Sequence, residues 1–218
     1  MRCGKWETSS LSPRNMEGTY VIKAEQVKEL RERTGSGMME CKKALTETGG
    51  DLEKAIIYLR EHGLAAAAKK AGRATGDGKI EAYIHSGSKL GVMVEVNCET
   101  DFVAKTDEYQ SLCHEIAMQI AASDPGYLER DQVPESVLEQ ETEIARTQAL
   151  SEGKPEKVID KIVQGRMEKF YQTVCLLEQP YIRDPQRSVR DLVNEAISKL
   201  GENIIIRRFV RFRLGEEA

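Results

Sequence analysis

The chain has 218 residues, of which 40% are hydrophobic, and its formal net charge at pH 7 is −4. This length suits one small and one medium domain, and the near balance of charges gives no global reason to expect nucleic-acid or membrane-surface binding. No apolar run approaches the roughly 20 residues that are needed to span a bilayer.

Residues 1–18 are predicted to be a disordered leader. The stretch from Met1 to Asn15 contains glycine, serine and proline but no apolar core, so it does not have the pattern of a secretory signal. Met16 is an alternative start of the folded protein. We therefore expect the folded part to begin near residue 19.

Residues 19–63 are predicted to form a bundle of three short helices. The first helix, 24–33, ends at the Gly35-Ser36-Gly37 turn, and the second, 38–48, ends at Gly49-Gly50. Asp51 is a good N-cap for the third helix. Apolar residues at helical spacing would build the core of the second and third helices: Met38, Cys41, Ala44, Leu45, Leu52, Ala55, Ile56 and Leu59.

Residues 64–78 are predicted to be a linker, and residues 79–218 to be a larger core domain. The linker is basic and contains a run of four alanines, followed by a Thr-Gly-Asp-Gly break. The core domain begins with two alternating segments, 80–84 and 92–98, which predict a hairpin of half-buried strands. Their apolar positions are Ile80, Ala82, Ile84, Val92, Val94, Val96 and Cys98.

The rest of the core domain is predicted to contain four helices and one strand. The helices are expected at 107–122, at 134–152, from Pro155 to a stop before Pro180, and at 189–200. In the final strand, 204–214, three apolar residues alternate with Arg211 and Arg213. These elements predict an α+β fold, in which helices pack on a small antiparallel sheet.

The sequence predicts neither a catalytic site nor a cofactor or metal site. The five cysteines contain no CxxC pair, and no histidine, cysteine and carboxylate cluster has metal-ligand spacing. Gly35-Ser36-Gly37 lacks the features of a phosphate-binding loop. A cysteine hydrolase using Cys98 and His85 is an alternative, but no nucleophile signature surrounds Cys98, which continues the alternation of its strand.

The arginine-rich final strand has two interpretations. Its arginines and phenylalanines resemble a basic and aromatic RNA-binding surface. Because side chains alternate in a strand, however, Arg211 and Arg213 would share one face while Phe212 points to the other. We favour a solvated sheet face and therefore predict no nucleic-acid partner.

Two apolar features suggest a protein partner. A helix does not easily bury both members of the Met38-Met39 pair, so one methionine is expected to face outward as a flexible apolar contact. Phe102 follows the buried alternation of its strand and lies in a polar junction. From the residues alone, Phe102 is either a local plug under the loop or an exposed contact for a partner.

The sequence resembles the short form of the bacterial elongation factor Ts family. Two long signatures carry the resemblance, in the order that the family has: LRERTGSGMMECKKAL at 30–45 and VEVNCETDFVA at 94–104. Shorter segments extend it to most of the chain, from about Val21 to Leu214: GDLEKA at 50–55, GKP at 153–155, EQP at 178–180 and GENI at 201–204.

The resemblance implies a role as guanine-nucleotide exchange factor in translation elongation, without covalent chemistry. Residues 19–63 would be a ubiquitin-associated-like domain, and the partner would be the GTPase elongation factor Tu in its GDP form. Asp101 and Phe102 would insert into its G domain near the nucleotide and Mg²⁺. The other implied partner-binding residues are Thr100, Val103, Met38, Met39, Arg31, Lys42, Leu90, Gly91 and Gln119.

Two departures from longer family members have consequences. The chain has room for one core subdomain only, and short forms are expected to pair as homodimers. Gln119 stands where many members have histidine; it keeps hydrogen-bonding capacity but cannot become cationic. The cysteines, interpreted as reduced thiols, and the absence of an evident transit peptide predict a cytoplasmic location. An adaptor that binds a ubiquitin-like protein through the small bundle is an alternative, but it leaves the Thr100–Val103 segment unexplained.

Overall fold

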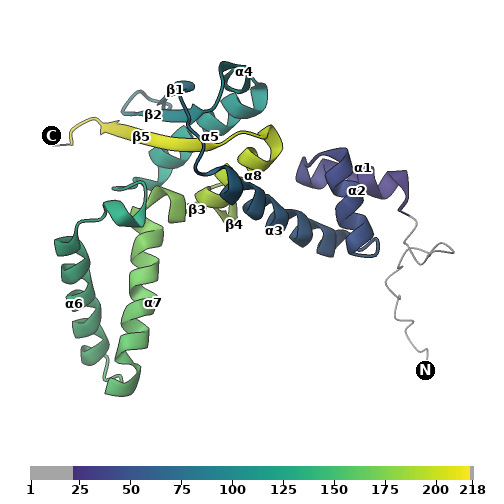
Figure 1. Ribbon diagram of the computed structural model, residues 1–218. Coiled ribbons are helices and arrows are strands. Elements are labelled where there is room, and N and C mark those ends of the chain that lie inside the picture. Colours follow the sequence, from purple (N-terminus) through teal and green to yellow (C-terminus); the bar gives the residue numbers. More distant parts are fainter. Residues whose placement is uncertain (1–21, 217–218) are drawn as a thin grey trace, which may run out of the picture. The chain divides into compact units, whose positions relative to one another are not determined.

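The computed structural model describes residues 22–216, so the predicted leader lies outside the described residues. Helices and a three-stranded antiparallel sheet make up most of the described chain, which confirms the α+β prediction (Figure 1). The chain divides into two units, Met1–Lys69 and Lys70–Ala218.

Three helices form the first unit: α1 (Ala24–Thr34), α2 (Met38–Glu47) and α3 (Leu52–Lys70). The sequence predicts the end of α3 near residue 63, but the helix continues because the following alanines have the highest helix propensity. The buried core consists of Val27, Leu30, Cys41, Ala44, Leu45 and Ala55. The predicted core stripe of α2 is therefore correct except for Met38, which is exposed.

The turn between α1 and α2 depends on Gly35. Its φ of 65° lies in the left-handed region, where a side chain would be strained, and its N–H donates to the Arg31 carbonyl at 2.7 Å. This bond satisfies a carbonyl at the end of α1 and turns the chain sharply. The second helix can then begin at Met38, immediately after Gly37.

The main sheet of the second unit has the strand order β1-β2-β5 and is antiparallel throughout. Strand β1 spans Asp77–Ile84, β2 spans Leu90–Cys98 and β5 spans Ile204–Arg213. The predicted hairpin is confirmed by the β1–β2 pairing. The register between β2 and β5 shifts between Glu95 and Val96, so the C-terminal strand is locally irregular.

Helices α5 (Asp107–Ser123) and α8 (Val189–Leu200) pack with the sheet, and Figure 1 shows them on one side of it. The alternating apolar residues of β2 lie on the side of the sheet that faces these helices, as predicted. The buried sheet residues are Val92, Val94, Val96, Cys98, Ile204 and Ile206.

The opposite side of the sheet carries an apolar surface, which we call the outer sheet face. It consists of Ile80, Ala82, Ile84, Met93, Val210 and Phe212, all of them exposed. The prediction that the apolar residues of β1 lie on a buried face is therefore wrong for a single chain. Alternation shows which residues share a face, but not which face the helices cover.

Two further helices, α6 (Glu135–Ser151) and α7 (Glu156–Val174), pair as a helical hairpin that extends away from the sheet (Figure 1). Its buried core is Ala145, Ala149, Ile159 and Val163. The apolar stripe of α6 is weak in the sequence because α6 buries alanines, which allow the two helices to approach closely.

Short elements that the sequence analysis did not predict complete the second unit. They are α4 (Asp101–Ala104), η1 (Arg130–Gln132), η2 (Leu176–Glu178) and the two-stranded sheet of β3 (Pro180–Tyr181) and β4 (Asp184–Ser188). Each is too short to show a periodic apolar pattern. Of these, α4 contains the predicted partner-binding pair Asp101 and Phe102.

Candidate partner-binding site

The segment Thr100–Val103 forms the start of a one-turn helix directly after β2. Thr100 has extended backbone angles and is the N-cap of α4, with its hydroxyl oxygen accepting from the Val103 N–H at 3.5 Å. Strand β2 ends at Cys98, where its pairing with both neighbouring strands also ends. The geometry therefore places α4 at one end of the sheet.

Phe102 is an exposed aromatic side chain, with 79% of its surface accessible. Of the two interpretations that the sequence left open, the structure excludes the local plug. An exposed aromatic ring gains no burial energy within the chain, and aromatic rings are frequent anchors of protein interfaces. Phe102 is thus available to a partner.

Asp101 is held beside Phe102 by a lysine that the sequence analysis did not single out. The Lys105 ammonium donates to the Asp101 carboxylate at 2.6 Å and keeps the pKa of Asp101 below its ordinary value. The signal was present in the sequence, because an acidic residue four positions before a lysine is a favourable helical pair. This pair presents a fixed carboxylate at neutral pH.

Two hydroxyl groups at the start of α5 link this helix to α4 and to β2. The Thr106 hydroxyl donates to the Val103 carbonyl at 2.8 Å and caps α5 by accepting from the Tyr109 N–H at 3.3 Å. The buried Tyr109 hydroxyl donates to the Val96 carbonyl at 2.6 Å. These bonds connect α4 to α5 and to the central strand.

The methionine pair is exposed on the first unit. Met38 is 60% accessible and Met39 is 75% accessible, so both methionines face outward rather than one. The other two predicted contacts of this unit, Arg31 and Lys42, are exposed as well. We call these four residues the methionine surface.

The predicted contact residues Leu90 and Gly91 are not brought together with Phe102. They begin β2, whereas Phe102 follows the end of the same strand. Both are partly buried in the sheet, where Gly91 pairs with Ile84 and with Phe212. Any partner contact at Leu90 and Gly91 is therefore separate from the one at α4.

Gln119 is not at the surface, contrary to its expected place among the partner contacts. Its side chain is 1% accessible because α5 presents it to the neighbouring loop. Its amide nitrogen donates to Gln179 Oε1 at 3.2 Å, and its amide oxygen accepts from the Ile182 N–H at 2.9 Å. These bonds give Gln119 a structural role between α5 and the small sheet.

The cysteine hydrolase alternative is contradicted by the distance along β2 between its two residues. The His85 N–H donates to the carbonyl of Leu90 at one end of this strand, whereas Cys98 ends the strand. The Cys98 thiol is buried, and burial raises its pKa. A protonated thiol that lies away from its base is not a nucleophile.

Metal binding has no structural support in the part of the chain that is described. Among residues 22–216, no group of three or more histidine, cysteine, aspartate or glutamate side chains is arranged to hold a metal ion. Nor does any described helix have both the length and the apolar composition to cross a membrane.

The solvated face predicted for the arginines of β5 is wrong for Arg211 only; Arg207, Arg208 and Arg213 are exposed. The Arg211 side chain is only 12% accessible and pairs with Asp124 at 3.1 Å and with Glu216 at 3.2 Å. Its neighbour Phe212 is 66% accessible on the outer sheet face. Arg211 is thus enclosed, whereas Phe212 and Arg213 are both exposed. Arg208 also pairs with a carboxylate, that of Glu95, at 2.7 Å.

Comparisons with known proteins agree on one family. The family model described as Elongation factor TS matches residues 23–216. A protein named Elongation factor Ts from Thermoanaerobacter pseudethanolicus is 66% identical over 196 residues, covering 90% of this chain and 96% of that protein. Proteins of the same name from Heliobacterium modesticaldum and Acetivibrio thermocellus are 63% and 61% identical, each over 90% of this chain and 91% of the relative. The similarity includes α4 and the methionine surface.

Proposed function

This chain belongs to the elongation factor Ts family, and we propose that it is the guanine-nucleotide exchange factor of the GTPase elongation factor Tu. It binds the GDP form of this partner and promotes GDP release during translation elongation. It makes and breaks no covalent bond, and so it is not an enzyme. The observation that carries the proposal is the exposed Phe102 on its one-turn helix, within a chain that matches the family from end to end of its folded part.

The proposed mechanism is thermodynamic coupling between two ligands of the partner. GDP and Mg²⁺ favour one arrangement of the partner's phosphate site, and insertion of Asp101 and Phe102 into the G domain favours another. Each ligand then weakens the binding of the other by the same factor. Phe102 supplies apolar contact, and Asp101 supplies a fixed charge near the phosphate and Mg²⁺ site. Thr100 and Val103 hold the turn that presents them.

The methionine surface is the second proposed contact with the partner. Methionine side chains are flexible and polarizable, so they adapt to an apolar surface of another protein. Arg31 and Lys42 add positive charge around Met38 and Met39. The three helices of this unit form a ubiquitin-associated-like domain whose function here is to bind the G domain. Leu90 and Gly91 form a further, separate contact.

We also propose that two copies of the chain pair as a homodimer. The support is the outer sheet face, where apolar residues of all three strands are exposed side by side: Ala82 pairs with Met93, and Met93 with Val210. An exposed apolar surface of this kind is typical of an interface. The dimer functions in the cytoplasm, with no nucleic acid or membrane as a partner.

Release of a fluorescent GDP analogue from purified elongation factor Tu tests the function. We expect fast release with the wild-type chain and a loss of at least about thirtyfold in kcat/KM for Phe102→Ala, which is the effect of removing an interface anchor. Leu150→Ala is the matched control, because Leu150 is exposed on α6, away from α4. This control is expected to keep the wild-type rate.

The other outcomes of this experiment are equally informative. Fast release by Phe102→Ala would keep the function but transfer the mechanism to another contact, such as the methionine surface. An absence of acceleration by the wild-type chain would contradict the exchange function. It would then favour the adaptor that binds a ubiquitin-like protein through the three-helix unit.

A further inference from the structure

Phe102 needs support that α4 does not provide. The helix is four residues long, too short to be stable without tertiary contacts, and the Phe102 ring is exposed. The orientation of the ring is therefore set by whatever holds the backbone before it. That backbone belongs to Glu99 and Thr100, which lie beyond the last residue of β2.

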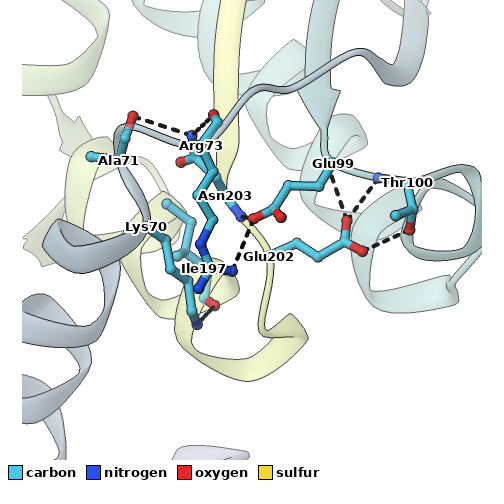
Figure 2. Close-up of polar contacts among 8 residues, drawn as sticks. All are labelled: Lys70, Ala71, Arg73, Glu99, Thr100, Ile197, Glu202 and Asn203. Carbon is cyan, nitrogen blue, oxygen red and sulfur yellow. Dashed lines mark hydrogen bonds and ion pairs between the residues drawn. The ribbon is translucent and has the colours of Figure 1, made fainter.

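One carboxylate accepts three hydrogen bonds from this segment, two from backbone N–H groups and one from a side-chain hydroxyl. Glu202 Oε2 accepts from the N–H of Glu99 at 3.1 Å and from the N–H of Thr100 at 3.0 Å, and Glu202 Oε1 accepts from the Thr100 hydroxyl at 2.6 Å. Figure 2 shows the Glu202 side chain reaching across to these groups from the opposite segment. Bonds to a charged acceptor are about twice as strong as neutral ones.

The end of α8 places Glu202 in this position. Gly201 has a φ of 81°, and its N–H donates to the Ile197 carbonyl at 3.1 Å, so the helix ends and the chain turns. Strand β5 then begins at Ile204, which pairs with Cys98. Glu202 consequently lies two residues before Ile204, within hydrogen-bonding distance of the N–H groups of Glu99 and Thr100.

The same two segments are also joined in the reverse direction. Glu99 Oε1 accepts from the Asn203 N–H at 2.6 Å and pairs with Arg73 at 3.4 Å. The side-chain amide nitrogen of Asn203 donates to the carbonyl oxygens of Ala71 at 3.3 Å and Arg73 at 3.0 Å (Figure 2). The bonds of Glu99 and Glu202 to backbone N–H groups thus connect the two segments beyond the last pair of the β2–β5 ladder. The bond of Glu99 to Asn203 also restrains the backbone next to Glu202.

The Thr100 hydroxyl transmits the position of Glu202 to α4. A hydroxyl has one proton, and here the proton is donated to Glu202, so a lone pair remains for the Val103 N–H. Glu202 therefore sets the direction of the N-cap hydroxyl as well as the place of its backbone. A glutamine at this position has only one acceptor oxygen for the same three donors.

We propose that Glu202 is a positioning residue for nucleotide exchange: through Thr100 it fixes the start of α4, so that Phe102 meets the partner in one orientation. This inference rests on the exchange function proposed above. In this proposal Glu202 acts only through Thr100 and the backbone of Glu99. Its effect is to reduce the number of conformations that Phe102 explores before insertion.

The test measures GDP release from elongation factor Tu over a range of factor concentrations, so that kcat and KM are separated. The variants are Glu202→Gln, Thr100→Val, Thr100→Ser, Phe102→Ala and the double variant Glu202→Gln with Phe102→Ala. Glu195→Gln is the control, because it makes the same chemical change on α8, where Glu195 pairs with Lys199 at 2.6 Å. Thermal unfolding of every variant is recorded alongside.

We expect Glu202→Gln and Thr100→Val each to lower kcat by about tenfold, the effect of losing a hydrogen bond to a charged group. Thr100→Ser keeps the hydroxyl and is expected to lose less than Thr100→Val. Glu195→Gln, outside the proposed contact, retains the wild-type rate. In the Phe102→Ala background, Glu202→Gln causes no further loss, because the residue that it positions is already absent. A purely structural role would lower the rate in both backgrounds.

Failure of this inference is distinguishable from failure of the function. If the wild-type chain accelerates release and Glu202→Gln does so at the wild-type rate, Glu202 is not a positioning residue while the exchange function stands. The same conclusion follows if the loss caused by Glu202→Gln multiplies with that of Phe102→Ala. If the wild-type chain does not accelerate release, both proposals are wrong. Should Glu202→Gln fail to fold, the comparison of Thr100→Val with Thr100→Ser decides: equal rates overturn the inference.

Discussion

At the scale of single residues, Cys98 and Phe102 show how sharply the environment changes at the end of β2. Cys98 is the last member of a buried alternation and donates a hydrogen bond to the Thr100 carbonyl at 3.2 Å. Phe102 follows the strand, and its side chain is exposed to solvent. The alternation correctly predicts Cys98, because its strand neighbours determine its side. No such pattern exists for a residue in a junction.

The buried thiols predict how stability depends on alkaline pH. Burial raises the pKa of the Cys113 thiol from 9.0 to about 12. The folded chain keeps this proton where the unfolded chain loses it, so its contribution is complete below about pH 9 and is lost as the pH rises through about 12. Near pH 10.5 this amounts to about 2 kcal/mol of lost stability.

The measurement is thermal unfolding at about pH 8 and about pH 10.5. We expect the melting temperature of the wild-type chain to fall more over this interval than that of Cys113→Ala, which has no thiol to ionise. Ser111→Ala, an exposed substitution on the same helix, controls for effects of changing α5. Equal decreases in the wild type and in Cys113→Ala would contradict the assignment.

At the scale of elements, the start of α2 explains why both methionines are exposed. The sequence predicts that a helix buries no more than one of two consecutive residues. Met38 and Met39, however, are the first two residues of α2, and the buried residues of this helix begin only at Cys41. The first turn therefore lies outside the core of the bundle, which periodicity alone does not reveal.

Replacing the methionines separates binding from insertion. We expect Met38→Ala with Met39→Ala to raise KM for nucleotide exchange by about tenfold and to leave kcat near its wild-type value, because these side chains add affinity without disturbing the phosphate site. Because both side chains are exposed, we expect the substitutions to change the free energy of unfolding by no more than about 0.5 kcal/mol. Steady-state exchange kinetics and thermal unfolding measure the two effects.

Leu64→Ala is the matched control for the methionine pair. Leu64 is an exposed apolar residue of α3 in the same unit, and its removal is expected to leave KM unchanged. If the methionine variant and this control behave alike, the methionine surface does not contact the partner. If kcat falls instead of KM rising, the surface acts in the release step and not in affinity.

At the scale of the whole molecule, the uncovered outer sheet face predicts self-association. The helices cover one side of the sheet, and the other side remains apolar. A charge placed on this face would have to be buried without a partner in a dimer. We expect Phe212→Glu to raise the dissociation constant of the homodimer by at least about tenfold.

Sedimentation equilibrium over a range of concentrations measures this constant. Leu150→Glu places the same charge on the exposed surface of α6, away from the sheet, and should leave the association state unchanged. A wild-type chain that stays monomeric at all concentrations would contradict the homodimer. A dimer that is unaffected by Phe212→Glu would place the interface elsewhere.

Local patterns in the sequence are enough to predict the α+β class. They also predict the seven longer helices and the three long strands of the described chain. These elements follow from apolar periodicity and from turn residues such as Gly35, which act over a few positions. The family resemblance likewise depends on contiguous residues, and it identifies the Thr100–Val103 segment without any coordinates.

Long-range packing settles the remaining features. Which side of the sheet the helices cover decides that Arg211 is enclosed and Phe212 exposed, and an alternating pattern is the same in either case. Gln119 is buried by a loop that is distant in sequence. Glu202 meets Thr100 across a separation of 102 residues. Such contacts exist only after the strands have paired, because no local interaction specifies which distant side chain will satisfy a given backbone group.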